Sequence, residues 1–172
     1  MIVVVSDTHA QTDPPLTDSL QRAISKAELV IHAGDFFRYP VLSAFEELAA
    51  DLVAVHGNVD DAELRSQLPS KRIISHQGVT IALTHTVGGG ETGLAAFGRE
   101  QDAALVISGH THRPGYRWTG ELGLLNPGSH AEPRGHRPAY AELDIDETQV
   151  VGRLRETDGS IFERFHIPRE GN

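Results

Sequence analysis

Two short segments each place two potential metal ligands two residues apart. The sequence GHTH at 109–112 follows an apolar run at 103–107, and the sequence SDTH at 6–9 follows an apolar run at 2–5. Residues two apart in an extended chain point to the same side, so each segment directs two polar side chains to one place. Imidazole and carboxylate groups are common ligands of transition-metal ions. We therefore expect both segments at a metal site.

The same arrangement recurs along the chain, because five apolar runs each precede a polar residue that can bind a metal. Their content of β-branched residues predicts buried strands. The runs and the polar residues after them are 2–5 before Asp7, 29–33 before Asp35, 52–55 before Asn58, 79–83 before His85 and 103–107 before His110.

The segments between the first runs have helical spacing. Apolar residues fall on one face over 16–27 and again over 41–49, which predicts two amphipathic helices. Alternating strands and helices predict a largely parallel sheet covered by helices, and ligands gather outside the carboxyl ends of such strands. We therefore expect the polar residues to meet at one edge.

The rest of the chain contains more strands than helices. We expect a hairpin from 71–75 and 79–84, a glycine-rich loop at 88–90 and a short helix at 91–99. Beyond Pro114 only strands are expected, either as an antiparallel second sheet or as a continuation of the first. These strands are 115–118, 122–125, 138–145, 149–155 and 160–167.

Length and composition limit the class of protein. A chain of 172 residues with 39% hydrophobic residues fits one domain, 1–172, and the absence of cysteine leaves only nitrogen and oxygen ligands for a metal. A net charge of -9 argues against strong binding to nucleic-acid backbones. No signal peptide or membrane-length apolar run is recognisable, so we expect a cytoplasmic protein without membrane attachment. A homo-oligomer is left open.

The polar residues at the strand ends suit two metal ions rather than one. Seven ligands exceed what a tetrahedral zinc ion needs, and a bridging carboxylate is the natural link between two ions. Two cations about 3.5–4 Å apart polarise a phosphoryl oxygen and lower the pKa of a bridging water, so we expect hydrolysis of a phosphate ester. The expected ligands are Asp7, His9, Asp35, Asn58, His85, His110 and His112.

The chain contains, in this order, the motifs Asp7-x-His9, Gly34-Asp35, Gly57-Asn58-x-Asp60, His85 and Gly109-His110-x-His112. They resemble the motifs of the calcineurin-like metallophosphoesterases. The chain is most similar to the branch of small bacterial and archaeal phosphodiesterases that also contains the retromer subunit of this fold. The resemblance covers about residues 2–129 and includes the companion sequence NPGS at 126–129.

The resemblance implies an α/β fold, a four-layer αββα sandwich of two mixed β-sheets flanked by helices, with the metal site at the strand carboxyl ends. It implies two divalent ions, with Mn²⁺ expected first and Ni²⁺, Fe²⁺, Co²⁺ or Zn²⁺ as alternatives. One ion would be held by Asp7, His9, Asp35 and His112, and the other by Asp35, Asn58, His85 and His110, so that Asp35 is the bridge.

The resemblance also implies a mechanism. A hydroxide that bridges the metals would attack a phosphodiester, and Asp35, Asn58 and His85 would act through that hydroxide. Asp60 would lie behind the ligands and orient a ligand histidine. The expected partner is a small phosphodiester substrate.

Two positions depart from the family pattern. Val59 stands where many members carry a histidine that protonates the leaving group, so esters with poor leaving groups should react about 10²- to 10⁴-fold more slowly. Thr86 and Val87 stand where Gly-His is usual, which leaves His85 as a ligand but alters the nearby substrate contacts.

Other polar and aromatic residues leave alternatives open. Arg113, His130 and Arg134 could contact a phosphate, as could His136 and Arg137, although solvated loop charges are the commoner case. His32 and His56 are expected as hydrogen-bonded core groups, and Thr8 and Thr111 as spacers. An aromatic run after Asp35 could form a wall for an aryl group or pack internally; it comprises Phe36, Phe37 and Tyr39.

Three functions are compatible with these features. The first is a dimetal phosphodiesterase. The second is a protein-interaction scaffold of the same fold, which predicts an exposed apolar patch on the β-rich side. The third is a phosphomonoesterase or nucleotidase, which would prefer monoesters to diesters.

Overall fold

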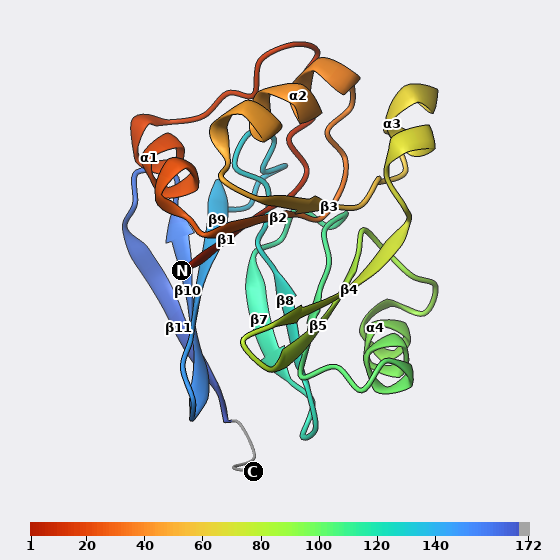
Figure 1. Cartoon of the computed structure of the whole chain (residues 1–172), viewed down its shortest axis with the longest axis vertical. Coiled ribbons are helices and arrows are strands. Elements are labelled where there is room, and N and C mark those ends of the chain that lie inside the picture. Colours follow the sequence, from red (N-terminus) through yellow and green to blue (C-terminus); the bar gives the residue numbers. More distant parts are fainter. Residues whose placement is uncertain (169–172) are drawn as a thin grey trace.

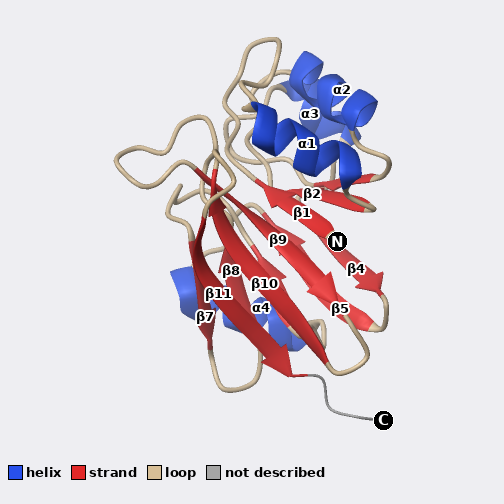
Figure 2. Ribbon diagram, turned by 90° about the vertical axis from the view of Figure 1, so that its left-hand side faces the viewer, coloured by secondary structure: helices blue, strands red, loops and turns tan. Residues whose placement is uncertain are grey.

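Two mixed β-sheets pack face to face, and helices cover the outer face of each sheet (Figures 1 and 2). The computed structural model describes residues 1–168. Successive layers are helices, sheet, sheet and helix, so the expected four-layer αββα architecture is confirmed.

The first sheet has six strands in the order β11-β10-β9-β1-β2-β3. The strands β1, β2 and β3 are parallel, whereas β9, β10 and β11 are antiparallel and join the sheet beside β1. The bounds are β1 Ile2–Val5, β2 Leu29–His32, β3 Leu52–Ala54, β9 Ala139–Ile145, β10 Gln149–Glu156 and β11 Ile161–Pro168.

The second sheet has five strands in the order β4-β5-β6-β8-β7. The strands β5, β6 and β8 are parallel, and an antiparallel strand closes each edge. The bounds are β4 Lys71–His76, β5 Val79–Thr84, β6 Leu105–Ile107, β7 Gly115–Trp118 and β8 Gly123–Asn126.

Four helices lie outside the sheets in the described part of the chain. Three of them, α1 (Asp18–Lys26), α2 (Tyr39–Leu48) and α3 (Ala62–Gln67), pack on the first sheet, and α4 (Gly90–Glu100) packs on the second. None of these helices is long and apolar enough to cross a membrane.

The start of α1 and of α3 is fixed by side-chain caps. The Thr17 hydroxyl accepts a hydrogen bond from the Leu20 N–H of α1, and the Asp61 carboxylate accepts one from the Leu64 N–H of α3. These caps satisfy amide groups that lack a partner within the helix. Leu20 and Leu64 are fully buried, so each cap also sets which face of its helix turns toward the sheet.

Three apolar clusters fill the spaces between the layers. The cluster between the sheets includes Ile2, Ile31, Ile81 and Ile107. The second, between the first sheet and its helices, includes Phe45, and the third lies under α4. Because the first cluster joins both sheets, it fixes the distance between their strand ends.

The expectation of one parallel sheet was wrong. The five apolar runs are divided, with β1, β2 and β3 in one sheet and β5 and β6 in the other. The later strands are divided too, because β7 and β8 extend the second sheet whereas β9, β10 and β11 extend the first. The antiparallel neighbours β9 and β4 take the free edges of β1 and β5, so the two parallel groups cannot join.

Truncation of Phe45 tests the packing of α2 on the first sheet. Its side chain is fully buried and contacts the rings of Phe36 and His32 at centroid distances of 6.0 and 5.1 Å. We expect Phe45→Ala to lower the free energy of unfolding by about 3–5 kcal/mol, measured by urea denaturation. Glu46→Ala, at the exposed next position, is the control. Equal stability of the two variants would contradict this packing.

Candidate metal centre

The seven expected ligands form one connected cluster where β1, β2, β3, β5 and β6 end. Within the second sheet, the Gly109 N–H of the β6 loop donates to the His85 carbonyl after β5. The His85 ring then contacts the Ala33 carbonyl after β2, which connects the two sheets. Parallel strands bring the carboxyl ends within each sheet to one edge, and the packing of the two sheets brings these edges together.

Two buried carboxylates lie at the centre of the cluster. Asp7 is 0% exposed and Asp35 is 2% exposed. The Asp7 Oδ1 atom lies 3.2 Å from His112 Nε2 and 3.7 Å from His9 Nε2. The Asp35 Oδ2 atom lies 3.1 Å from His85 Nε2 and 3.6 Å from His9 Nε2. Asp35 thus touches histidines that the sequence assigned to different metals.

Two overlapping groups of side chains could each hold an ion. The ligand atoms of Asp7, His9 and His112 lie within 4.8 Å of one another, and so do those of Asp7, Asp35 and His85. The first group contains three of the four ligands expected for the first metal. The second group includes Asp7, which the sequence assigned to the first metal alone.

Asn58 and His110 join the cluster beside His85. The Asn58 Oδ1 atom lies 3.1 Å from His85 Nε2 and 2.8 Å from His110 Nδ1. The backbone N–H of His110 also donates to the Asp7 carboxylate. These contacts bring together the residues expected at the second metal.

Carbonyl groups fix the orientation of two ligand imidazoles. His85 Nδ1 lies 2.8 Å from the Ala33 carbonyl oxygen, and His112 Nδ1 contacts the Glu132 carbonyl oxygen. Because a carbonyl only accepts, each Nδ1 is the protonated donor and each Nε2 faces the carboxylates. This is the arrangement of a metal-binding histidine.

The electrostatics of the His85 and Asp35 pair favour a cation between the carboxylates. Burial by itself would lower the pKa of His85, but the hydrogen bond to Asp35 and the charges of Asp35 and Asp7 raise it above its usual value. Burial would raise the pKa of Asp35, but the hydrogen bond and charge of His85 and the Val59 N–H lower it. Positive charge is therefore stabilised at this point.

The residues fit a divalent metal ion. His9 Nε2 is buried and has no hydrogen-bond partner in residues 1–168, although it faces both carboxylates. The other ring nitrogen of His9 lies 3.4 Å from the Glu132 carboxylate. A buried polar atom without a partner is rare in proteins, and a metal ion would satisfy it. Nitrogen and oxygen donors of this kind suit Mn²⁺, Fe²⁺, Ni²⁺, Co²⁺ or Zn²⁺.

Asp60 lies behind the ligands, but the expectation that it orients a ligand histidine was wrong. Its carboxylate accepts three backbone hydrogen bonds, from the N–H groups of Asp35, Phe37 and Gly57 at 3.1, 2.7 and 2.7 Å. It therefore ties the loop after β2 to the loop after β3. Sequence spacing could not reveal this, because the donors are main-chain groups.

The ligand loops have unusual backbone conformations. Asp7, His9, Asp35, His110 and His112 all have φ between 47° and 72°. This left-handed region costs non-glycine residues about 1–3 kcal/mol each and is concentrated at functional sites. Gly109 allows the close approach of the loops, since a Cβ there would lie 2.0 Å from Ser6 Oγ and 2.7 Å from Asp7 Oδ2.

Thr8 is not the simple spacer that the sequence predicts. His32 Nδ1 accepts from the Gly34 N–H, so its Nε2–H donates to the Thr8 hydroxyl, which in turn donates to His130 Nε2. Burial lowers the pKa of His32 well below its usual value and lowers that of His130 to about 4, so both rings are neutral near pH 7. This chain holds the loop that carries Asp7 and His9.

His130 was one of the possible phosphate contacts, with a solvated loop charge as the alternative, and its burial fits neither role. It is 6% exposed and packs edge-on against Phe45, so it cannot supply a charge to a ligand. Arg113 and Arg134 are both exposed, and the Arg134 Nε lies 3.4 Å from the Glu132 carboxylate. Phe36 is fully buried against His32 at a centroid distance of 3.5 Å, which supports internal packing rather than an aryl-binding wall.

Sequence reasoning missed the residues that join the ligand loops from outside. Asn126 Nδ2 donates to the Gly109 carbonyl and to the Thr111 hydroxyl, at 2.8 and 3.0 Å. The Ser129 hydroxyl donates to the Asp7 carbonyl at 2.7 Å and accepts from the Glu132 N–H. The NPGS sequence was recognised as a family feature, and its role is to hold these loops together.

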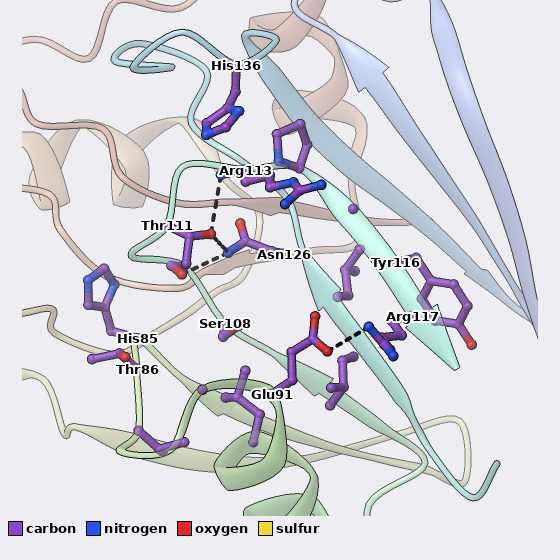
Figure 3. A pocket seen from close by; sticks show the side chains of 18 of the residues that line it. His85, Thr86, Glu91, Ser108, Thr111, Arg113, Tyr116, Arg117, Asn126 and His136 are labelled. Carbon is purple, nitrogen blue, oxygen red and sulfur yellow. Dashed lines mark hydrogen bonds and ion pairs between the residues drawn. The ribbon is translucent and has the colours of Figure 1, made fainter. Parts of the chain in front are cut away.

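A cleft of about 900 Å³ opens beside the cluster (Figure 3). His85, Gly109 and Thr111 line its inner end, so it is continuous with the ligand residues. It then extends along the second sheet between α4 and β7. The cleft therefore has room for a ligand larger than a phosphate group bound at the ligand cluster.

Buried carboxylates and imidazoles at the strand ends of an αββα sandwich are typical of metal-dependent phosphoesterases. Residues 1–148 match the family model of the calcineurin-like phosphoesterase superfamily domain, and the chain belongs to this family. The resemblance given by the motifs is thereby confirmed.

Individual relatives agree with this assignment. A probable metallophosphoesterase of Methanothermobacter thermautotrophicus is 31% identical over 173 residues, covering 98% of this chain and 99% of that protein. Phosphodiesterase YfcE of Escherichia coli is 31% identical over 135 residues, covering 74% of this chain and 69% of that protein.

The fold extends to more distant proteins. The structure of Vacuolar Protein Sorting 29 from Cryptosporidium parvum matches with a TM-score of 0.84 at 16% identity, covering 98% of this chain and 97% of that one. At this identity the likeness shows a shared fold.

Substitution of Thr8 tests the buried hydrogen-bond chain. In Thr8→Val, the His32 N–H and the His130 ring nitrogen lose their shared partner while the side chain keeps its shape. We expect the free energy of unfolding to fall by about 1–3 kcal/mol for each buried group left unpaired, measured by urea denaturation. Thr8→Ser keeps the hydroxyl and should be close to the wild type. A Thr8→Val variant as stable as Thr8→Ser would refute the role of the hydroxyl.

Proposed function

We propose that this chain is a dimetal-dependent phosphodiesterase. The observation that carries the proposal is the pair of buried carboxylates, Asp7 and Asp35, with the unpartnered Nε2 atom of His9 facing both. Membership of the phosphoesterase family supports phosphoester hydrolysis, and the name of the YfcE relative favours diesters.

We propose that the ligand set divides between two ions as the family motifs imply. Asp7, His9, Asp35 and His112 would hold one divalent ion, and Asp35, Asn58, His85 and His110 the other. The contacts of Asp35 Oδ2 with His9 and His85 support its role as the bridge. The contact of Asp7 with both groups means that its carboxylate lies close to both positions. We propose Mn²⁺ as the first ion to test.

Two divalent ions in this position supply Lewis-acid polarisation of a phosphoryl oxygen and lower the pKa of a water molecule. The chain's own residues hold the site in shape. The carbonyl groups of Ala33 and Glu132 keep the His85 and His112 rings turned toward the carboxylates, and the Val59 N–H holds Asp35 Oδ1 at 3.0 Å. Positioned ligands of this kind reduce the reorganisation needed during reaction.

The leaving group receives no proton from position 59, because valine cannot donate one. Val59 is half-buried directly after Asn58, and its backbone is bonded to Asp35. A substrate with a good leaving group needs no such acid. Activated diesters are therefore the substrates that this site should hydrolyse fastest.

The scaffold alternative predicts an exposed apolar patch. Within residues 1–168, the large apolar side chains that are exposed are Ile73 at 47% and Trp118 at 42%. They lie on β4 and β7, the opposite edge strands of the second sheet, so they do not form one patch together. This distribution supports the enzyme over the scaffold.

Metal loading and activity test the proposal together. We expect about two divalent ions per chain, measured by elemental analysis after loading, and hydrolysis of bis-p-nitrophenyl phosphate at a higher rate than p-nitrophenyl phosphate. Asp35→Asn removes the bridging charge and should abolish turnover, whereas Asp13→Asn, at an exposed position, should not change it. Full occupancy without turnover with Mn²⁺, Ni²⁺, Co²⁺ or Zn²⁺ would overturn the proposal.

Val59→His tests the role of the missing acid. We expect a gain of about 10²-fold or more for diesters with poor alcohol leaving groups and little change for p-nitrophenyl esters, which need no acid. The measurement is the ratio of kcat/KM for the two ester types, with Val59→Gln as the control for size and polarity. A folded Val59→His variant with an unchanged ratio would show that position 59 does not reach the leaving group.

A further inference from the structure

The cleft beside the metal centre contains an apolar wall that the metal ligands do not need. Val87 and Leu94 are half-buried and line the cleft from the loop before α4 and from α4 itself. Leu124 of β8 lines it from the sheet and is 7% exposed. Apolar surface at the wall of an open cleft gains free energy when a ligand covers it.

The cleft runs away from the metal centre rather than around it. His85 lies at one end and Tyr116 and Arg117 lie at the other (Figure 3). Its volume of about 900 Å³ is at the upper end of the range of about 300–1,000 Å³ that holds a drug-sized ligand. A phosphate group with a methyl ester would leave most of this space unfilled.

Two arginines that line the cleft differ in whether they have an ion-pair partner. Arg113 directly follows the ligand His112, lines the cleft, and has no ion-pair partner in the described part of the chain. Arg117, farther out, is neutralised by Glu91 at 2.9 Å. Arg113 therefore supplies an arginine without an ion-pair partner to the cleft, and His136 and Glu163 also line it. The apolar wall of Val87, Leu94 and Leu124 carries no charge of its own.

We infer that this cleft binds the second ester arm of the substrate, and that this arm is an uncharged apolar or aromatic group. The inference rests on the proposed phosphodiesterase function and adds the substrate class. The phosphodiester anion lies at the metal centre beside Arg113, and the arm that is not released covers Leu94, Leu124 and Val87. Binding energy from such a remote group raises kcat/KM for the diesters that carry it.

Two diesters with the same leaving group test this inference. Methyl p-nitrophenyl phosphate and phenyl p-nitrophenyl phosphate are both monoanions. In each, a water oxygen bonds to phosphorus as the bond to p-nitrophenolate breaks, which releases methyl or phenyl phosphate and a proton. We expect kcat/KM for the phenyl ester to exceed that for the methyl ester by about tenfold or more in the wild type.

Variants of α4 assign this preference to the cleft. Leu94→Gln makes the wall polar and should reduce the phenyl-to-methyl ratio of kcat/KM by about threefold or more. Leu94→Met keeps an apolar side chain and should keep the ratio. Ala96→Gln, at an exposed position on the same helix that does not line the cleft, is the matched control.

A binding measurement gives a second readout without turnover. Diphenyl phosphate should bind the metal-loaded wild-type protein more tightly than dimethyl phosphate in calorimetric titration, and Leu94→Gln should remove the difference. Hydrolysis of the methyl ester with a phenyl-to-methyl ratio that Leu94→Gln does not change would overturn the inference and leave the proposed function standing. Failure to hydrolyse either ester would instead overturn the proposed function, and this inference with it.

Discussion

Asp7 and Asp35 bring two carboxylates into the interior at the ends of the neighbouring parallel strands β1 and β2. Moving an ionised carboxylate out of water costs on the order of several kcal/mol of desolvation free energy unless opposite charge and hydrogen bonds compensate it. The imidazoles around the pair can do so only when protonated, and His9 Nε2 has no hydrogen-bond partner in the described chain. A divalent cation would satisfy the carboxylates and the ring nitrogens at once, so the need for positive charge at this point accounts for the arrangement of the site.

The rest of the fold holds this cluster in a conformation that the chain would not adopt by itself. Ligand residues such as Asp35 and His112 occupy left-handed backbone conformations. Backbone N–H groups that donate to the Asp60 carboxylate, and the Asn126 amide that donates to the Gly109 carbonyl, tie the ligand loops to neighbouring loops. The surrounding structure thereby holds the strain. The apolar cluster between the sheets fixes the separation of ligands from β1 and β2 and ligands from β5 and β6.

The convergence of the seven expected ligands could be predicted from the sequence, because each follows an apolar run and parallel strands of one sheet end at one edge. The partition of the strands between two sheets could not, since periodicity does not encode which strands pair. Helix α3 escaped prediction because it has six residues and buries only Leu64. The partners of Asp60 are backbone N–H groups, and His130 reaches Thr8 across 122 positions of sequence, so neither contact leaves a local signal.

Crystals grown with Mn²⁺ and measured near the manganese absorption edge test the central claim most directly. Two anomalous difference peaks are expected about 3.5–4 Å apart, with the Asp35 carboxylate in contact with both. One peak should lie against His9 and His112 and the other against His85 and Asn58. A single peak, or two peaks with Asp35 bound to only one of them, would contradict the account.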